Sequence, residues 1–567
     1  MKPGIELTLQ QQQEMVVALR SSLASAHGGS VRLIETHISY VLVAAMFAYK
    51  FKKVLRTHFL DQSCLTARLQ ACREELRLNR RLAPALYLDV VPVTRSWQTP
   101  ELGGDGYIID FAVKMRAFSQ DHLWDKLAQG SLLQAAHVDD LLAQLLPFHA
   151  GAARAAAQGH LGSPGQIHTL VRANVDELEA LAVDEVEHAT LQHLRAWQAD
   201  QFAQIEGLLA RRLAQGRVRE CHGDLHLGNV AQVDGRATVF DAIDFSAEYR
   251  TIDVMSDVAF MAMDLQAHDL PGLARRFVNG YLEATGDFEG VQVLDYYLVH
   301  RALVRAKIAL LRAAQQVAPT GGRKGARASI ARPATDLAEH YLALARQYMR
   351  GSQPMLLITH GYSGSGKSTL TQALVEASGA VRIRSDVERK RLAGQRTGGE
   401  HPCEHPVADR RMAGGGACAA IAATSPTSTP LALYGIDMTA ATYERLLELA
   451  RLVLQSGRSV ILDATFLRQA DRSAARRLAM DLGIACVLLD FDVPVATLRE
   501  RLHLRTWQGT DASDADVAVL ERQLKLAEPL TAAERESAYA VVQAAGDRAV
   551  VAGEAWASLL HRYPQLA

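Results

Sequence analysis

A glycine-rich segment of the sequence has the residue types and spacing of a phosphate-binding loop. The run GYSGSGKST fits the pattern G-x-x-x-x-G-K-[ST]. Glycines let backbone N–H groups turn inward around phosphates, a lysine reaches the outer phosphates of a nucleotide, and the next hydroxyl binds Mg²⁺. The residues predicted to bind nucleotide are Gly361, Ser363, Gly364, Ser365, Gly366, Lys367, Ser368 and Thr369, and Ser368 is also a predicted Mg²⁺ ligand.

Two carboxylates lie where strands of a P-loop fold would end. SVILDAT is typical of a buried strand ending in Asp463, a position at which a carboxylate lies near Mg²⁺. VRIRSD indicates a second short strand, which ends in Asp386. Ligands of parallel sheets bind outside the carboxyl ends of the strands, so Asp386 can be a catalytic residue that accepts a proton from an attacking hydroxyl. The alternative is that Asp386 caps the N-terminus of the helix that follows.

A helical segment further along the same half carries two arginines. In TLRERLHLRTWQ, Leu498 and Leu502 share one helix face. Arg501 and Arg505 are four residues apart and share another face. These arginines are predicted to contact the nucleotide and to clamp the transferring phosphate. A solvated helix face explains them nearly as well, so both interpretations stay open.

The N-terminal half contains a second cluster of polar residues. The run HGDLHLGN, residues 222–229, matches the kinase catalytic-loop pattern H-x-D-x-x-x-x-N. In this pattern a carboxylate must reach the acceptor hydroxyl, and an amide further along the loop must hold Mg²⁺. The sequence therefore predicts Asp224 as a catalytic residue and Asn229 as a metal ligand.

A β-hairpin is predicted directly after this loop. The Asp-Gly pair at 234–235 is a strong two-residue turn signal between the strand-like segments NVAQV and RATVF. Folding about this turn places Asn229 opposite Phe240 and next to Asp241, so Asn229 and Asp241 can share a metal ion. Asp241 is therefore preferred as the second Mg²⁺ ligand, and Asp244, which lies beyond the paired region, is the alternative.

These motifs carry resemblances to known families. The catalytic loop resembles that of the aminoglycoside phosphotransferase group, and this resemblance spans most of residues 30–345. From Gly361 onward the chain resembles small-molecule P-loop kinases of the polynucleotide-kinase, zeta-toxin and gluconate-kinase group. The order of the two halves resembles bifunctional aminoglycoside phosphotransferase/ATP-binding proteins. The resemblance implies an α+β protein-kinase-like domain followed by an α/β P-loop NTPase domain with a parallel sheet. The segments that carry it are ETHISYVLVAAMFAYKFKK, CREELRLNRRLAP, CHGDLHLGN and GYSGSGKST.

The resemblance to aminoglycoside phosphotransferases implies further site residues. The strand-like AYKFKK offers Lys50 as the catalytic lysine on the ATP phosphates, with Lys52 as the alternative on the same strand face. The helical CREELRLNRRL offers Glu75 as its carboxylate partner, with Glu74 as the alternative. FAVKMRAF, residues 111–118, is predicted to be the strand and hinge between two lobes. VLVAAMFAY stands where a protein kinase has a glycine-rich loop.

The domain boundary is predicted at a turn-forming stretch. GSQP, residues 351–354, precedes the strand-like MLLITH, which gives domains 1–350 and 351–567. Residues 317–335 hold several glycines, prolines and basic side chains and are interpreted as a solvated loop rather than a basic docking patch.

A long irregular stretch, residues 397–437, lacks periodicity. Within it His401, Cys403 and His405 could bind a metal, but no second ligand cluster in the sequence supports this.

The composition favours a small-molecule substrate. The 567 residues include 61 basic and 62 acidic side chains, so the net charge of −1 gives no overall attraction to nucleic acid or to membranes. Six cysteines form no C-x-x-C pair and are interpreted as reduced thiols. With no apolar segment of about 20 residues for a membrane span, a cytoplasmic location is predicted.

The function predicted from these features is ATP-dependent phosphoryl transfer. Each half would bind ATP and Mg²⁺ and move the γ-phosphoryl group to a hydroxyl of a small-molecule acceptor, through positioning and charge neutralisation. Two alternatives are a nucleotide-binding conformational switch with negligible transfer and an ATPase whose acceptor is water. The sequence does not identify the acceptor or the oligomeric state.

Overall fold

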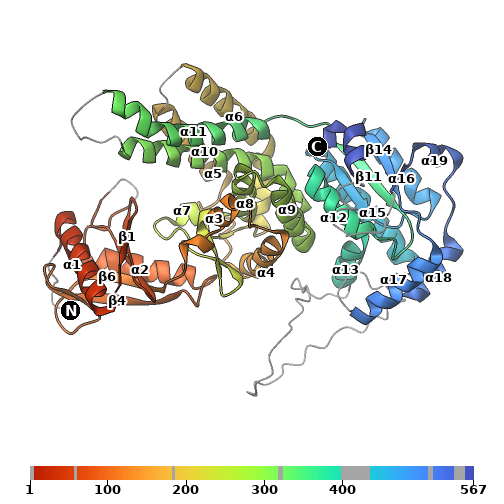
Figure 1. Cartoon of the computed structure of the whole chain (residues 1–567). Coiled ribbons are helices and arrows are strands. Elements are labelled where there is room, and N and C mark those ends of the chain that lie inside the picture. Colours follow the sequence, from red (N-terminus) through yellow and green to blue (C-terminus); the bar gives the residue numbers. More distant parts are fainter. Residues whose placement is uncertain are drawn as a thin grey trace. The chain divides into compact units, whose positions relative to one another are not determined.

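The chain forms two compact units (Figure 1). The computed structural model describes residues 6–27, 29–56, 60–181, 185–316, 324–396, 435–508, 515–541 and 556–566. The first unit consists of Met1–Leu270 and Leu294–Met349, and the second of Pro271–Val293 and Arg350–Ala567. One division lies between Met349 and Arg350, one residue before the predicted boundary, while the segment 271–293 belongs to the second unit. That 1–350 and 351–567 are separate folding domains stays a prediction.

The first unit begins with a six-stranded antiparallel sheet in the order β1-β2-β3-β6-β4-β5. Helix α1 packs on one face, in a core with Leu42, Phe51 and Val93, and helix α2 packs on the other, in a core with Phe111 and Val113. The elements are α1 (Leu9–His27), β1 (Arg32–Glu35), β2 (Ser39–Val43), β3 (Phe47–Lys52), α2 (Leu65–Asn79), β4 (Tyr87–Arg95), β5 (Pro100–Leu102) and β6 (Ile108–Arg116).

Strand β3 shows how this sheet positions functional side chains. Successive side chains of a strand point to opposite faces. Tyr49 and Phe51 therefore join the core under α1, while Lys50 and Lys52 point to the face that carries α2. The strand predicted at AYKFKK, the helix predicted at CREELRLN and the strand predicted at FAVKMRAF are all confirmed.

The rest of the first unit is mostly helical and contains two small antiparallel sheets, β7 with β10 and β8 with β9. Helix α8 is buried from Val254 to Leu265 and forms its centre. The elements are η1 (Gln120–His122), α3 (Trp124–Gln129), α4 (Ala135–Gly151), α5 (Pro164–Leu181), α6 (Glu185–Ala214), β7 (Val218–Glu220), η2 (Leu227–Asn229), β8 (Val230–Val233), β9 (Arg236–Val239), α7 (Ala247–Arg250), β10 (Thr251–Asp253), α8 (Val254–Ala267), α10 (Val291–Gln316) and α11 (Lys324–Tyr348).

Helix α11 corrects one expectation. It begins at Lys324, so the solvated loop predicted over 317–335 is wrong from that residue onward, and residues 317–323 lie outside the described part of the chain. The segment KGARASIARPAT holds four alanines, the residue with the highest helix propensity, and these outweigh the Gly and Pro that suggested a loop.

The second unit is built on a parallel five-stranded sheet in the order β12-β13-β11-β14-β15, as the P-loop resemblance implied. Leu357, Leu374 and Trp556 belong to its core. The elements are α9 (Pro271–Thr285), η3 (Phe288–Gly290), β11 (Met355–His360), α12 (Lys367–Ser378), β12 (Val381–Arg384), α13 (Ser385–Arg396), α15 (Ile436–Gln455), β13 (Val460–Asp463), α16 (Gln469–Asp481), β14 (Ala485–Asp490), α17 (Val495–Gln508), α18 (Val517–Leu526), α19 (Ala532–Ser537), β15 (Tyr539–Ala540) and η4 (Pro564–Leu566).

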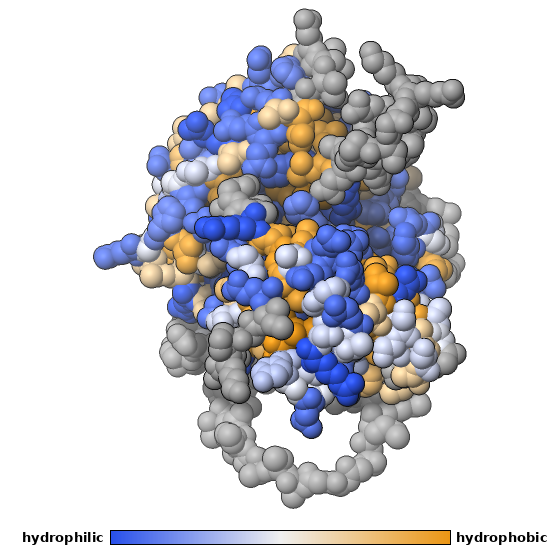
Figure 2. All heavy atoms as spheres, turned by 90° about the vertical axis from the view of Figure 1, so that its left-hand side faces the viewer, coloured by the Kyte–Doolittle hydropathy of each residue, from blue (hydrophilic) through white to orange (hydrophobic). Residues whose placement is uncertain are grey.

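The surface gives no sign of a membrane-spanning element in the described residues. No described helix combines the length and the apolar character needed to cross a bilayer. On the face shown in Figure 2, hydrophilic side chains lie among small groups of hydrophobic ones. Apolar side chains scattered in this way are ordinary on protein surfaces.

Candidate active sites

The catalytic-loop segment 222–229 is held in place by a carboxylate of helix α8. The backbone N–H groups of His222 and Gly223 donate hydrogen bonds to the two oxygens of Asp257, at 2.8 and 2.9 Å. Asp257 is fully buried. Buried backbone amides must find partners, so this carboxylate fixes the path of the loop where the loop begins.

A second carboxylate and an arginine fix the rest of the loop. Asp264 lies two turns further along α8 and accepts the N–H of Leu227 at 2.9 Å. From α10, Arg301 donates to the carbonyl of Gly223 at 3.0 Å. Gly223 has φ of +84°, and a Cβ at this position would lie 2.7 Å from the carbonyl oxygen of Tyr249. Only glycine therefore fits at this turn.

Asp224 and Asn229 contact each other directly. The Asn229 side-chain amide donates to the backbone carbonyl and to Oδ2 of Asp224, both at 2.9 Å. Burial alone would raise the pKa of the Asp224 carboxyl, but the nearby His226 and Arg305 outweigh burial and hold the pKa well below its usual range. Asp224 is therefore an ionised carboxylate at neutral pH.

His222 links this loop to the hairpin that follows. Its Nε2 lies 3.0 Å from the carbonyl of Phe240 and donates to it, while its Nδ1 accepts the N–H of Asp224 at 3.3 Å. Burial lowers the pKa of His222, which keeps the ring neutral and suits this pattern of one donor and one acceptor. His222 is thus a structural link in the loop.

The hairpin has the predicted register. Val230 pairs with Val239, and the N–H of Phe240 donates to the carbonyl of Asn229 at 3.0 Å. Asn229 therefore lies opposite Phe240, which confirms the predicted placement. The next residue, Asp241, has φ of +62°, a left-handed conformation that is uncommon outside glycine.

Two lysine–carboxylate pairs meet at Glu75. Lys50 contacts Oε1 of Glu75 at 2.8 Å and Asp241 at 2.5 Å, while Lys52 contacts Oε2 of Glu75 at 2.7 Å and also Asp244. Burial alone would raise the pKa of Glu75, but the two lysines outweigh it and lower the pKa to about 2. Helix α2 thus turns Glu75 toward both candidate lysines.

The two pairs differ in their exposure. The side chain of Asp241 is 46% exposed, whereas that of Asp244 is 7% exposed, and Lys52 is more buried than Lys50. The outer pair, Lys50 with Asp241, can reach a ligand from solvent. The inner pair, Lys52 with Asp244, forms part of the packed interior.

This difference predicts distinct outcomes for two matched substitutions. Asp241→Asn should weaken Mg²⁺-dependent ATP binding and leave the melting temperature almost unchanged, because its carboxylate is open to solvent. Asp244→Asn should lower the free energy of unfolding by about 3 kcal/mol, because it leaves Lys52 charged, buried and short of a partner. Calorimetric ATP titration and thermal melting of both variants measure the two effects. A larger loss of ATP binding at Asp244 than at Asp241 would contradict this assignment.

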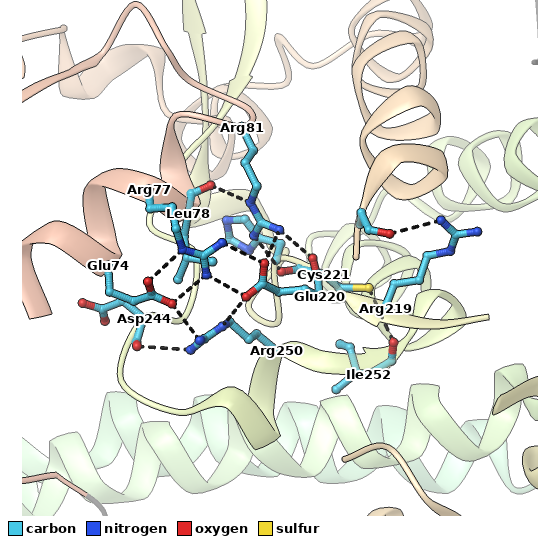
Figure 3. A network of polar contacts seen from close by, with 12 residues as sticks. Glu74, Arg77, Leu78, Arg81, Arg219, Glu220, Cys221, Asp244, Arg250 and Ile252 are labelled. Atoms are coloured by element: carbon cyan, nitrogen blue, oxygen red, sulfur yellow. Dashed lines mark hydrogen bonds and ion pairs between the residues drawn. The ribbon is translucent and has the colours of Figure 1, made fainter. Parts of the chain in front are cut away.

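Glu74, the alternative to Glu75, belongs to a separate ion network shown in Figure 3. It contacts Arg77 at 2.7 Å and Arg250 at 2.8 Å, and both arginines also contact Glu220, at 2.7 and 3.2 Å. Arg250 further donates to the carbonyl of Asp244 at 3.2 Å. Glu74 therefore ties α2 to the strand that leads into the catalytic loop.

The P-loop of the second unit has the predicted strand–loop–helix context. Strand β11 ends at His360 and α12 begins at Lys367, with the glycine-rich segment between them. Gly361 has φ of +144°, and a Cβ there would lie 2.8 Å from the carbonyl oxygen of Phe491. Lys367 is buried and donates to the carbonyls of Gly361 and Tyr362 at 2.9 and 2.7 Å. The loop therefore wraps around the lysine ammonium.

The two predicted carboxylates of this unit follow neighbouring strands. Asp463 is the last residue of β13, is buried, and contacts Thr371 at 3.4 Å and Arg384 at 3.9 Å. Strand β12 ends at Arg384, and Asp386 is the second residue of α13 rather than its N-cap. Asp386 accepts a hydrogen bond from Arg389 at 2.8 Å. Asp463 thus ends its strand as predicted, whereas Asp386, which was predicted to end a strand, lies two residues beyond β12 in the first turn of α13.

Helix α17 confirms the predicted helix at TLRERLHLRTWQ. Leu498 and Leu502 are fully buried on one face, and Arg501 donates to the carbonyl of Gly364 in the P-loop at 3.4 Å. The side chain of Arg505 lies outside the described residues, as do His401, Cys403 and His405.

One P-loop contact comes from a residue that the sequence analysis missed. Gln523 of α18 accepts the N–H of Ser363 at 2.9 Å and donates to the hydroxyl of Ser363 at 2.9 Å.

The supporting residues of the first unit that the sequence did not reveal are Asp257, Asp264, Arg301, Arg250 and Glu220. Two of them had a sequence signal, because the otherwise apolar VMSDVAFMAMDL carries Asp257 and Asp264 seven residues apart, on one helix face.

Comparisons with known proteins give a separate family match for each half of the chain. Residues 54–294 match a family model described as "Phosphotransferase enzyme family", and residues 356–530 match one described as "AAA domain". Uncharacterized proteins of Mycobacterium bovis and Mycobacterium tuberculosis are 29% identical to the chain over 486 residues, which cover 86% of this chain and 88% of theirs.

Two solved structures that are similar to parts of the chain are described as a kinase family protein and a kinase. A choline/ethanolamine kinase family protein from Mesorhizobium loti covers 59% of this chain and 99% of its own, with 12% identity and a TM-score of 0.33. A gluconokinase from Sinorhizobium meliloti covers 38% of this chain and 97% of its own, with 22% identity and a TM-score of 0.23.

The two family models support a kinase-type phosphotransferase, with the match to the phosphotransferase enzyme family in the N-terminal half followed by the match to the AAA domain. The resemblance drawn from the sequence motifs is confirmed.

Proposed function

We propose that each unit binds ATP with Mg²⁺ and transfers the γ-phosphoryl group to a hydroxyl of a small molecule. The observation that carries this proposal is the group formed by Asp224, Asn229, Asp241 and Lys50. An ionised carboxylate, an amide, a second carboxylate and a lysine come together at one end of the hairpin β8–β9. A kinase active site needs these four functions.

The residues present suit Mg²⁺, which prefers oxygen ligands. Asn229 directs its amide nitrogen to Asp224, so its carbonyl oxygen is the atom that remains for a cation. Asn229 and Asp241 would hold the ion in the first unit, and Ser368 and Asp463 in the second. When bound, Mg²⁺ would supply positive charge that neutralises the negative charge developing during phosphoryl transfer.

In the first unit, the protein would position the reactants. Lys50, held between Glu75 and Asp241, would bind ATP phosphate oxygens as a point charge. Asp224 would accept a hydrogen bond from the acceptor hydroxyl and take its proton as the acceptor oxygen bonds to the γ-phosphorus. The bond from this phosphorus to the β,γ-bridging oxygen breaks in the same transfer, and ADP is the leaving group. Helix α8, through Asp257, would keep Asp224 in place by fixing the backbone before it.

In the second unit, the P-loop amides and Lys367 would bind the phosphates. Asp386 would act on the acceptor hydroxyl, and the arginines Arg501 and Arg505 would cover the phosphates. Lys367 now donates to P-loop carbonyls, and nucleotide phosphates would replace these carbonyls as its partners.

The rival proposal, a nucleotide-binding switch, has one observation in its favour. Strands β1, β2 and β3 are joined by short turns at 36–38 and 44–46 that contain no glycine, whereas protein kinases have a glycine-rich loop over the phosphates. A switch has no need of the carboxylate Asp224 beside Asn229, and this weighs against it in the first unit.

The test is a panel of hydroxyl-bearing metabolites with labelled ATP. The full-length chain should transfer label to a subset of sugars, amino alcohols, nucleosides or related compounds. Variants Asp224→Asn and Lys367→Ala, run in parallel, assign each product to one unit. Nucleotide binding without any labelled product, in the presence of Mg²⁺, would favour the switch, and release of phosphate alone would favour an ATPase.

A further inference from the structure

The P-loop unit contains a helix that the chain encodes far from the P-loop. Helix α9, Pro271–Thr285, precedes the P-loop by about 80 residues, lies inside the span matched by the phosphotransferase family model, and belongs to the second unit. It lies alongside α12, the helix that follows the P-loop (Figure 1). Side chains from three successive turns of α9 form polar bonds with the rest of this unit.

Arg275 supplies hydrogen-bond donors to the C-terminal end of α12. Arg275 donates to the carbonyls of Glu376 and Ala377 at 3.2 and 2.5 Å, and these belong to the last turn of that helix. The last carbonyls of a helix lack intrahelical partners and favour a nearby cation. Next to it, Arg276 pairs with the side chain of Glu376 at 2.6 Å.

Further along, α9 covers the edge of the parallel sheet. Strand β12 is an edge strand in the order β12-β13-β11-β14-β15. The side-chain oxygen of Asn279 accepts the backbone N–H of Arg382 in β12 at 2.7 Å, and both residues are buried. An edge strand leaves backbone groups without ladder partners, and burial makes this costly. Asn279 supplies the missing partner.

Glu283, one turn later, binds the two arginines of β12. Its carboxylate contacts Arg382 at 3.2 Å and Arg384 at 3.0 Å, and all three side chains are mostly buried. Burial alone would raise the pKa of Glu283, but the two guanidinium groups outweigh it and lower the pKa. Glu283 is therefore a charged group at the centre of a buried ion cluster.

Both arginines also contact groups assigned to nucleotide or Mg²⁺ binding. Arg382 donates to the carbonyl of Ser368 at 2.8 Å and so supports the first turn of α12. Arg384 lies 3.9 Å from the carboxylate of Asp463. Arg384 thus lies between two carboxylates, and it is closer to Glu283 than to Asp463.

We infer that Glu283 is a positioning residue of the P-loop site, supplied from within the phosphotransferase family span, and that it keeps Asp463 available to Mg²⁺ by holding Arg384. This inference rests on the proposed ATP–Mg²⁺ site of the second unit. Asp463 is a second carboxylate within 4 Å of Arg384 among the described residues. An Arg384 side chain released by loss of Glu283 would therefore compete with Mg²⁺ for Asp463. A residue within the span that the phosphotransferase family model matches, 54–294, would therefore serve the P-loop site.

The test uses the full-length chain carrying Asp241→Asn, so that remaining ATP binding reports the second unit. The quantity measured is the Mg²⁺ concentration that gives half-maximal binding of a fluorescent ATP analogue. Adding Glu283→Gln should raise this concentration by about fivefold or more, because the Arg384 guanidinium, which Glu283 now holds at 3.0 Å, would move from 3.9 Å into direct contact with Asp463 and oppose cation binding there. Adding Arg384→Gln as well should return it to within about twofold of the starting value, because the competing cation is gone.

The matched control is Glu376→Gln. This substitution removes the ion pair between Arg276 of α9 and Glu376 of α12, and among the described residues Glu376 makes no hydrogen bond or ion pair with Arg382, Arg384 or Asp463. The control should leave the Mg²⁺ requirement unchanged. Melting temperatures without nucleotide show whether each variant is folded, and a purely structural role for Glu283 would lower the melting temperature without rescue by Arg384→Gln. An unchanged Mg²⁺ requirement in Glu283→Gln, or no rescue, overturns the inference. If Lys367→Ala leaves ATP binding intact, the proposed site itself is wrong.

Discussion

Replacing Asp224 by asparagine is expected to abolish phosphoryl transfer in the first unit while ATP–Mg²⁺ binding stays nearly intact. The amide keeps the shape of the side chain and a hydrogen bond near Asn229, but it cannot take the acceptor proton. Loss of a general base typically lowers the rate by about 10² to 10⁴. The groups assigned to the nucleotide, Lys50 and Asp241, contact each other and Glu75 rather than Asp224, so binding should survive.

The measurement is made in the full-length chain carrying Lys367→Ala, so that turnover belongs to the first unit. Initial rates with labelled ATP and the best acceptor give the transfer activity, and calorimetric titration gives ATP affinity. The matched control is Asp234→Asn, an exposed carboxylate at the hairpin turn that pairs with Arg116 at 2.6 Å. It should transfer phosphate at the parental rate. Equal turnover in Asp224→Asn and the parent would refute a kinase mechanism here and favour the nucleotide switch.

The sequence predicts the local parts of both sites because short-range rules govern them. The alternation of AYKFKK places Lys50 and Lys52 on one face of β3, and the Asp-Gly turn sets the register that brings Asp241 beside Asn229. The glycine spacing of the P-loop likewise fixes its backbone. In each case the residues that cooperate lie within one element or in two elements joined by a tight turn.

The long-range supports could not be predicted in the same way. Asp257 bonds to the loop amide of His222, 35 residues earlier, and Glu283 pairs with Arg382, 99 residues later. Helical periodicity identifies which face of α9 is apolar, but it does not say which unit will bury that face. Buried carboxylates in apolar helices are nevertheless a usable signal, because burial of such a charge requires a partner.

The ion network around Glu220 illustrates the same limit for the choice between Glu74 and Glu75. Both fall on one helix, and neighbouring residues of a helix point about 100° apart. The structure places Glu75 against the lysines and Glu74 against Arg250, so one glutamate faces the candidate nucleotide site and the other holds the helix. The helical spacing of Leu78 and Leu82 after Glu75 favours Glu75, and its contacts with both lysines agree with that choice. Spacing alone does not reveal that Glu74 contacts Arg250.

Replacing Lys367 by alanine should remove one of two ATP equivalents that the full-length chain binds. The P-loop encloses this ammonium, which donates to the carbonyls of Gly361 and Tyr362. Its loss removes the charge that would meet the outer phosphates and also leaves two carbonyls facing the nucleotide. The affinity of the second unit should fall by about tenfold or more, which corresponds to about 1.4 kcal/mol.

Calorimetric titration with ATP and Mg²⁺ reports both affinity and stoichiometry, which should fall from two to one. The matched control is Lys525→Ala, which removes an exposed lysine of α18 in the same unit and should change neither value. Because Lys367 is buried, melting of the ligand-free variant must first show that it is folded. Two equivalents bound with parental affinity by a folded Lys367→Ala chain would exclude the P-loop as a nucleotide site. One equivalent, bound with the affinity of the first unit, would establish that Lys50 and Lys367 serve separate sites.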